Sequence, residues 1–261
     1  MKQSKFNKKY KAIIFDVDGT LIPIKIDAMP SEKVKKAIDK ASKKIKISIA
    51  TSRPNILAQR IMEHLSLTAP CILAGGGNIY DPVEKKILLE VLMEKELLRK
   101  IKTLTKRLNF EMDVYDSGGS DYPMSKYKFN KPMHVWIGGL KPEKAQILFD
   151  ELSKISELSV HKLTSWDKGR VDVMATPPEA TKQHGILKVA EILGIETHDI
   201  IGVGDGYNDF PLLMACGLKI AMGNAVSELK EIADYIAPSV EEDGVVDIIE
   251  KFILRKEAIK I

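Results

Sequence analysis

Cysteine is scarce in this chain: Cys71 and Cys216 are the only two among 261 residues. They are far apart, and each stands among apolar residues. The sequence therefore offers neither a disulfide framework nor a cluster of thiolate ligands for a metal ion. We expect both thiols to be buried as small apolar side chains.

Long apolar runs are missing as well. No segment approaches the roughly 18 to 20 consecutive apolar residues that a membrane-spanning helix needs. The N-terminal segment is rich in lysine but has no apolar stretch of the kind found in signal peptides. We therefore expect a cytoplasmic protein without a membrane partner.

Neither sign of charge dominates, since 40 basic residues stand against 36 acidic ones and the formal net charge is +4. Lysines gather on the predicted helix 31–43 without interleaved aromatic residues, which indicates a solvated face and no nucleic-acid partner. Hydrophobic residues make up 44% of the chain, enough for the core of a soluble globular protein. We expect a monomer or a small homo-oligomer.

Strand-like and helix-like runs alternate near both ends of the chain. This alternation is typical of parallel βαβ units and predicts an α/β fold with a doubly wound parallel sheet. The predicted strands are 11–16, 45–50, 71–74, 199–204, 218–222 and 235–236, and the predicted helices are 31–43, 55–65, 181–193, 209–215 and 226–233.

The pattern changes in the middle of the chain. The predicted order there is helix 94–108, strand 110–115, polar loop 116–130, strand 133–138, helix 142–155 and strands 158–163 and 170–174. It indicates an α+β insert with an antiparallel sheet, long enough to form its own small domain. We therefore expect a core made of residues 1–82 and 179–261, and an inserted domain over 83–178.

Two acidic residues follow the first predicted strand. Asp16 and Asp18 are two positions apart, so the pleat sends both side chains to the same side of the chain. Such a pair persists when a cation lies between the carboxylates or when one keeps its proton, and both situations occur at catalytic sites. Gly19 and Thr20 then turn the chain and leave amides to face an anion. Taken alone, an Asx-type turn explains the pair equally well.

Further polar residues stand at predicted strand ends or helix starts, where open α/β sheets place their ligands. Thr51 follows a strand, Lys182 begins a helix, and Asp205 and Asp209 follow another strand. The helix dipole disfavours a lysine at a helix start, so a bound anion explains Lys182 better than chance does. Asp209 and its neighbour Asn208 could also cap the helix that follows. Together these groups form a complete set for phosphoryl transfer.

In these motifs the chain resembles the haloacid dehalogenase superfamily, and more narrowly its Cof-type phosphatases with a large C2-type cap. The motifs that carry the resemblance are Asp16-Val17-Asp18-Gly19-Thr20, Thr51, Lys182, Gly204-Asp205-Gly206-Tyr207-Asn208-Asp209 and Met222-Gly223-Asn224-Ala225. The resemblance covers essentially the whole chain. It implies a Rossmann-like core and a cap, formed by the insert, that selects the substrate.

The resemblance also implies roles for single residues. Asp16 would be the nucleophile that forms an aspartyl-phosphate, and Asp18 would protonate the leaving group and then activate water. Thr51, Lys182 and Asn208 would bind the phosphate.

The implied cofactor is Mg²⁺, which prefers oxygen ligands. Asp16, Asp205 and the backbone carbonyl of Asp18 would hold the ion, with Asp209 in support. Ser52 and Gln183 stand where glycine is usual in the family, and we expect each side chain to narrow the room around the phosphate.

Five side chains could reach the rest of a substrate: Arg53, Trp136, Trp166, Lys168 and Arg170. Lys168 and Arg170 lie in a polar turn before a predicted strand of the insert, the sort of position that meets a leaving group.

The sequence thus predicts a Mg²⁺-dependent phosphatase of small phosphorylated metabolites, such as sugar phosphates or phospho-acids like phosphoglycolate. A phosphomannomutase-like sugar phosphomutase stays open, because it shares the style of core and cap. A non-catalytic binding or regulatory module on the same scaffold also stays open, although every required residue is present.

Overall fold

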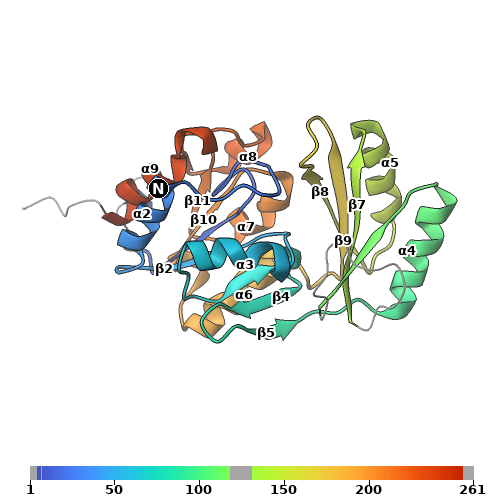
Figure 1. Cartoon of the computed structure of the whole chain (residues 1–261), viewed down its shortest axis with the longest axis horizontal. Coiled ribbons are helices and arrows are strands. Elements are labelled where there is room, and N and C mark those ends of the chain that lie inside the picture. Colours follow the sequence, from blue (N-terminus) through green and yellow to red (C-terminus); the bar gives the residue numbers. More distant parts are fainter. Residues whose placement is uncertain (1–4, 7, 118–130, 255–261) are drawn as a thin grey trace, which may run out of the picture.

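The structure is a computed structural model that describes residues 5–6, 8–117 and 131–254. Figure 1 shows two parts, a larger core and a smaller cap. The core contains a parallel sheet in the order β12-β11-β10-β1-β2. Its strands are β1 (Ala12–Phe15), β2 (Lys46–Ile49), β10 (Ile200–Gly204), β11 (Leu218–Ala221) and β12 (Tyr235–Ile236). The predicted doubly wound sheet is confirmed.

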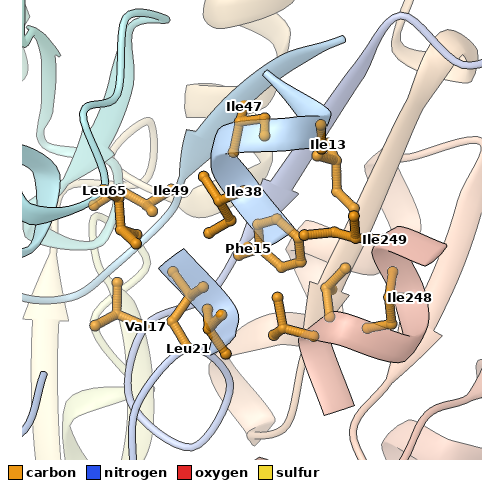
Figure 2. Packing of buried hydrophobic residues seen from close by; sticks show 14 of the residues in the cluster. Ile13, Phe15, Val17, Leu21, Ile38, Ile47, Ile49, Leu65, Ile248 and Ile249 are labelled. Atoms are coloured by element: carbon orange, nitrogen blue, oxygen red, sulfur yellow. The ribbon is translucent and has the colours of Figure 1, made fainter. Parts of the chain in front are cut away.

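Helices cover both faces of this sheet. One face carries α2 (Glu32–Ala41), α3 (Asn55–His64) and α9 (Gly244–Ile249), and the other carries α6 (Lys182–Leu193), α7 (Phe210–Ala215) and α8 (Ser227–Ile232). Side chains of β1 alternate between the two layers. Ile13 and Phe15 pack toward α2 and α9 (Figure 2), and Ile14 packs toward α6. Full burial of each such side chain stabilises the fold by roughly 1.5–3 kcal/mol.

An antiparallel hairpin extends the core beyond the predicted elements. Strands β3 (Cys71–Leu73), β4 (Asn78–Asp81) and β5 (Lys86–Glu90) form a second sheet, joined to the first by a bridge between Ala50 and Ile72. The expected boundary after residue 82 falls inside this hairpin. Because β5 pairs with β4, its residues lie with the core, and the chain leaves for the cap only after residue 90.

The cap is an antiparallel sheet in the order β6-β7-β9-β8 with two helices on one face (Figure 1). Its elements are α4 (Lys95–Arg107), β6 (Asp113–Asp116), β7 (Pro132–Leu140), α5 (Pro142–Leu152), β8 (Ser159–Thr164) and β9 (Val171–Thr176). These match the predicted α+β insert, except that most of the predicted polar loop 116–130 lies outside the described residues. The helices pack on the outer face, so the inner face of the sheet is turned toward the core.

Short helical turns complete the chain: η1 (Ala74–Gly76), η2 (Thr197–Asp199), η3 (Tyr207–Asp209), η4 (Val240–Glu242) and η5 (Glu250–Leu254). Cys71 and Cys216 are buried and unpaired, as expected. Among the described residues, no helix combines the length and apolarity that crossing a membrane requires.

A buried histidine stands in the cap sheet. His134 of β7 is fully buried, and its ring stacks on that of Tyr115 with the centroids 4.6 Å apart. Within the described part of the chain, neither of its ring nitrogens has a hydrogen-bond partner. Burial therefore lowers the pKa of His134 to about 3.

This burial predicts a loss of stability in acid. The unfolded chain takes up a proton near the ordinary histidine pKa of about 6.5, whereas folded His134 stays neutral down to about pH 3, so unfolding becomes more favourable as the pH falls between these values. His134→Phe keeps a stacked ring without the titration. From about pH 7.5 to 4.5, urea denaturation should show that it loses about 2 to 3 kcal/mol less than the parent.

The control is His198→Gln, which removes a histidine that is 67% exposed and lies 3.4 Å from Asp199. This variant should not show the smaller loss of stability that we expect of His134→Phe. Equal losses in the parent and in His134→Phe would show that His134 does not drive the acid response.

Candidate active site

The core sheet brings two acidic residues together at its carboxyl end. Asp16 directly follows β1 and Asp205 directly follows β10, and these two strands are adjacent and parallel. The Asp16 amide donates to the carbonyl of Val203 at 2.8 Å, so the ladder holds this residue in place. The chain order reverses at β1, which has β2 on one side and β10 on the other. Open α/β sheets bind their ligands at such a switch point.

Three carboxylates cluster there. Asp16, Asp205 and Asp209 each offer an oxygen, and these atoms lie within 4.8 Å of one another, with all three residues buried. The Lys182 ammonium, also buried, donates to Asp16 Oδ1 and to Asp209 Oδ1 at 2.5 Å each. One positive charge thus faces three acidic groups.

The crowding shifts the ionisation of these groups. Burial raises the pKa of Asp16, and the Asp209 carboxylate adds to this, while Lys182 opposes both. Burial also raises the pKa of Asp205 well above its ordinary value, and the charges of Asp16 and Asp209 act in the same direction. For Lys182, burial lowers the pKa, but Asp16 and Asp209 outweigh it and raise the pKa overall. Lys182 therefore does not offset the cost of ionising Asp16 and Asp205 in this buried cluster, and a further cation would favour their charged forms.

The loop after β10 is closed by Asp209. Its Oδ2 accepts hydrogen bonds from the backbone amides of Asp205 and Gly206, both at 2.9 Å, while its Oδ1 faces Lys182. The side chain makes no capping bond to α7, so the idea that it caps this helix is wrong. The reason is geometric: it turns back toward the end of β10 and braces the loop that carries Asp205.

The turn after Asp18 approaches Asp205 very closely. A Cβ atom on Gly19, whose φ is +85°, would lie 2.1 Å from Asp205 Oδ2, so only glycine fits. The Thr20 hydroxyl donates to Asp205 Oδ1 at 3.2 Å, and Asn224 Nδ2 donates to the Gly19 carbonyl at 2.8 Å. The sequence analysis assigned Thr20 only to the turn and gave Asn224 no role, although both stand in the motifs of the resemblance.

Thr51 and Asn208 line the same cleft. Thr51 is buried just after β2, and its Oγ1 accepts a hydrogen bond from the Arg53 amide at 3.1 Å. Asn208 Nδ2 donates to Ser52 Oγ at 3.3 Å. The hydroxyl at position 52 therefore links the two phosphate-binding segments that the sequence predicts.

Asp18 stands apart from the carboxylate cluster. Its carboxylate receives two hydrogen bonds from the Arg53 guanidinium, at 2.7 and 2.8 Å, and a third from the Trp166 indole at 3.1 Å. Its side chain is not one of the three clustered groups, so a metal contact through the Asp18 backbone carbonyl stays a prediction. Arg53 lies in the site, but its guanidinium is already hydrogen-bonded to the Asp18 carboxylate.

A cleft lies between the core site and the inner face of the cap. It encloses about 640 Å³, including open solvent at its mouth. The core side carries the groups described above, among them Asp16, Thr51 and Asn208. The cap side is largely aromatic and apolar, formed by Tyr115, Trp136, Leu163, Thr164, Trp166 and Asp172.

Three predicted residues lie outside this cleft. Lys168 and Arg170 are exposed on the turn between β8 and β9 and do not line it, so a contact of either residue with the leaving group stays a prediction. Gln183 is exposed as well, and the expectation that it narrows the phosphate site is wrong, because the side chain of this helix-start residue faces solvent. Trp136 and Trp166 do line the cleft.

The residues present fit a Mg²⁺ ion. The clustered donors of Asp16, Asp205 and Asp209 are all oxygen atoms, which this hard cation prefers. A divalent cation would also favour the ionised forms of these carboxyl groups, which burial opposes. The donor set has no thiolate or imidazole to favour a softer metal.

Comparisons with known proteins agree with this geometry. A family model described as haloacid dehalogenase-like hydrolase matches residues 13–136 and 121–249. The chain is 31% identical to a 5-amino-6-(5-phospho-D-ribitylamino)uracil phosphatase of Bacillus subtilis, over 94% of this chain and 96% of that protein. It is 26% identical to phosphoglycolate phosphatase 1 of Saccharolobus solfataricus, over 93% and 96% of the two chains.

Solved structures share the fold. A HAD/COF-like hydrolase from Plasmodium vivax superposes with a TM-score of 0.80 at 19% identity, covering 98% of this chain and all of the other. A haloacid dehalogenase-like hydrolase from Bacillus subtilis gives a TM-score of 0.78 at 19% identity, covering 92% and 99%. With a family model over most of its length and these phosphatase relatives, the chain belongs to the haloacid dehalogenase-like hydrolases, as a phosphatase of the Cof type.

Proposed function

We propose that this protein is a Mg²⁺-dependent phosphatase of small phosphorylated metabolites that works through an aspartyl-phosphate. The observation that carries the proposal is the placement of the Asp16 carboxylate at the floor of the cleft, 2.5 Å from Lys182 and clustered with Asp205 and Asp209. A carboxylate repels a phosphate group unless nearby positive charge offsets the negative charges of the two groups. Lys182 supplies part of that charge, and a cation at the cluster would supply the rest.

In the first step Asp16 attacks phosphorus, and the bond to the leaving oxygen breaks. Lys182, Thr51 and Asn208 bind the phosphoryl oxygens as negative charge spreads over them. Asp18 gives its proton to the leaving oxygen. In the second step Asp18 takes a proton from the water that hydrolyses the aspartyl-phosphate, which restores Asp16.

Asp16 and Asp205 would hold the Mg²⁺ ion, with Asp209 bracing the loop that carries Asp205. When bound, the ion supplies charge stabilisation for the phosphoryl group as it moves. The short bonds from Lys182 keep Asp16 and Asp209 aligned beside it.

The confined cleft under the cap supports the proposal that the substrate is a small molecule. The inner face of the cap meets the core across this cleft, so the group attached to the phosphate must lie against Trp136 and Trp166. We propose sugar phosphates or phospho-acids such as phosphoglycolate as substrates. Phosphoglycolate and 5-amino-6-(5-phospho-D-ribitylamino)uracil, named for two relatives, belong in the first panel to be tested for phosphate release.

Product analysis separates hydrolysis from the open alternatives. With a hexose phosphate, a phosphatase releases inorganic phosphate, whereas a phosphomannomutase-like enzyme yields a positional isomer. A binding module yields neither product. No contact in the described residues favours the mutase or the binding module over hydrolysis.

Loss of the nucleophile should abolish turnover. We expect Asp16→Asn to lower phosphate release from p-nitrophenyl phosphate by at least about 10³-fold, because the amide is a poor nucleophile. Asp18→Asn should lower it by roughly 10²-fold or more, through loss of the acid and base. Phosphate release under saturating substrate is the measurement.

The matched control is Asp39→Asn, which makes the same change on the surface of α2, where the Asp39 carboxylate forms an ion pair with Lys35. Its rate should equal that of the parent. A rate for Asp16→Asn equal to that of the parent would end the enzymatic proposal.

Mg²⁺ should stabilise the folded chain. Binding to the native cluster alone adds about 2.7 kcal/mol at one hundred times the dissociation constant, which raises the thermal midpoint of chelator-treated protein. Asp205→Asn should remove this increase together with the activity. Without metal, the same variant should unfold at an equal or higher temperature than the parent, because burial disfavours the Asp205 charge.

Thermal unfolding with and without Mg²⁺ measures both predicted changes: the rise in the midpoint of the parent with Mg²⁺, and the equal or higher midpoint of Asp205→Asn without it. An equal rise in midpoint for the parent and for Asp205→Asn would place the ion elsewhere on the chain.

A further inference from the structure

One cap residue touches the proposed acid of the core. The Trp166 indole Nε1 donates to Asp18 Oδ1 at 3.1 Å, a contact between residues 148 positions apart in sequence. Trp166 follows β8. The Arg53 guanidinium lies over its ring, 5.3 Å from the ring centroid, in a cation–π contact. The cap thus reaches the reaction centre with a hydrogen-bond donor.

The contacts of Asp18 divide unequally between its two oxygens. Oδ1 accepts from Arg53 Nη2 at 2.7 Å and from Trp166, whereas Oδ2 accepts only from Arg53 Nε at 2.8 Å. Each carboxyl oxygen has two lone pairs. Within the described residues, the open position is therefore on Oδ2.

Arg53 belongs to the core independently of the cap. Its guanidinium is only 4% exposed and also donates to the backbone carbonyls of Ile26 at 3.0 Å and Lys25 at 3.1 Å. These core contacts fix the arginine and, through it, the plane of the Asp18 carboxylate. Trp166 adds the one donor to Asp18 that depends on the cap lying over the core.

We propose that Trp166 is a positioning residue for protonation of the leaving group, an inference that rests on the proposed phosphatase function. By filling Oδ1, the indole N–H leaves Oδ2 as the oxygen that exchanges the proton. As the phosphorus–oxygen bond breaks and phosphorus bonds to Asp16, the Oδ2 proton passes to the leaving oxygen and Asp18 becomes a carboxylate. The proton transfer is thereby aligned only when the cap is closed.

Trp136 provides a matched control in the same cleft. Its ring stacks against Trp166 with the centroids 6.4 Å apart and the planes at 23°. Its indole hydrogen bonds to Asp172 within the cap, and among the described residues the indole that donates to Asp18 is that of Trp166. Replacing either tryptophan with phenylalanine removes an N–H group and keeps an aromatic ring on the cleft wall.

The test compares two esters that differ in how much they need a proton. Phenolate is a strong base and leaves poorly without protonation, whereas p-nitrophenolate is a weak base and leaves readily as an anion. The quantity measured is kcat/KM for phenyl phosphate and for p-nitrophenyl phosphate, because it reports the step in which the leaving group departs. The ratio of the two values is independent of the active fraction of a preparation, so partial misfolding of a variant does not affect it.

We expect Trp166→Phe to lower the ratio of phenyl phosphate to p-nitrophenyl phosphate by about tenfold, part of the effect of a general acid. Trp136→Phe also alters the cleft wall and so changes the rates with both esters, but it should lower the ratio less than Trp166→Phe does, since the Trp136 N–H does not bond to Asp18. An unchanged or increased ratio in Trp166→Phe, or an equal fall in Trp136→Phe, would overturn the inference. A parent that hydrolyses neither ester would instead contradict the phosphatase proposal and, with it, this inference.

Discussion

The structure depends on one electrostatic arrangement, in which three buried carboxylates share a single ammonium group. Asp16, Asp205 and Asp209 surround Lys182 at the carboxyl end of the sheet, and all four are almost fully buried. Such a group is unfavourable on its own, because desolvation and mutual repulsion both oppose ionisation. A bound cation would stabilise the charged forms of these carboxylates, and the cation would in turn attract a phosphate group.

The backbone around the cluster is built to hold it. Parallel strands β1 and β10 set Asp16 and Asp205 side by side, and the loop between β10 and α7 is closed by the Asp209 carboxylate. Gly19 removes the side chain that would collide with Asp205. These hydrogen bonds fix the positions of the charged side chains, so the side chains need to move little when a phosphoryl group binds.

Local patterns of the sequence predicted the parts of this design that local chemistry determines. Alternating apolar runs located the core strands and helices, and acidic residues at strand ends located Asp16 and Asp205. The hairpin of β4 and β5 was missed because its short strands follow a glycine-rich turn and lack a clear alternation. The exposure of Lys168 and the contact of Trp166 with Asp18 depend on how the cap packs on the core, which no local pattern encodes.

The cluster and the cap come from different parts of the chain. Within the described residues, the two acceptors of the Lys182 ammonium, Asp16 and Asp209, lie in the core segments, and the cap contributes the Trp166 indole to the hydrogen bonds of Asp18. The hairpin keeps residues up to 90 with the core, so the cap begins and ends in short connections. Evolution could therefore exchange the whole inserted domain, and with it the range of accepted metabolites, without rebuilding the machinery that moves the phosphoryl group.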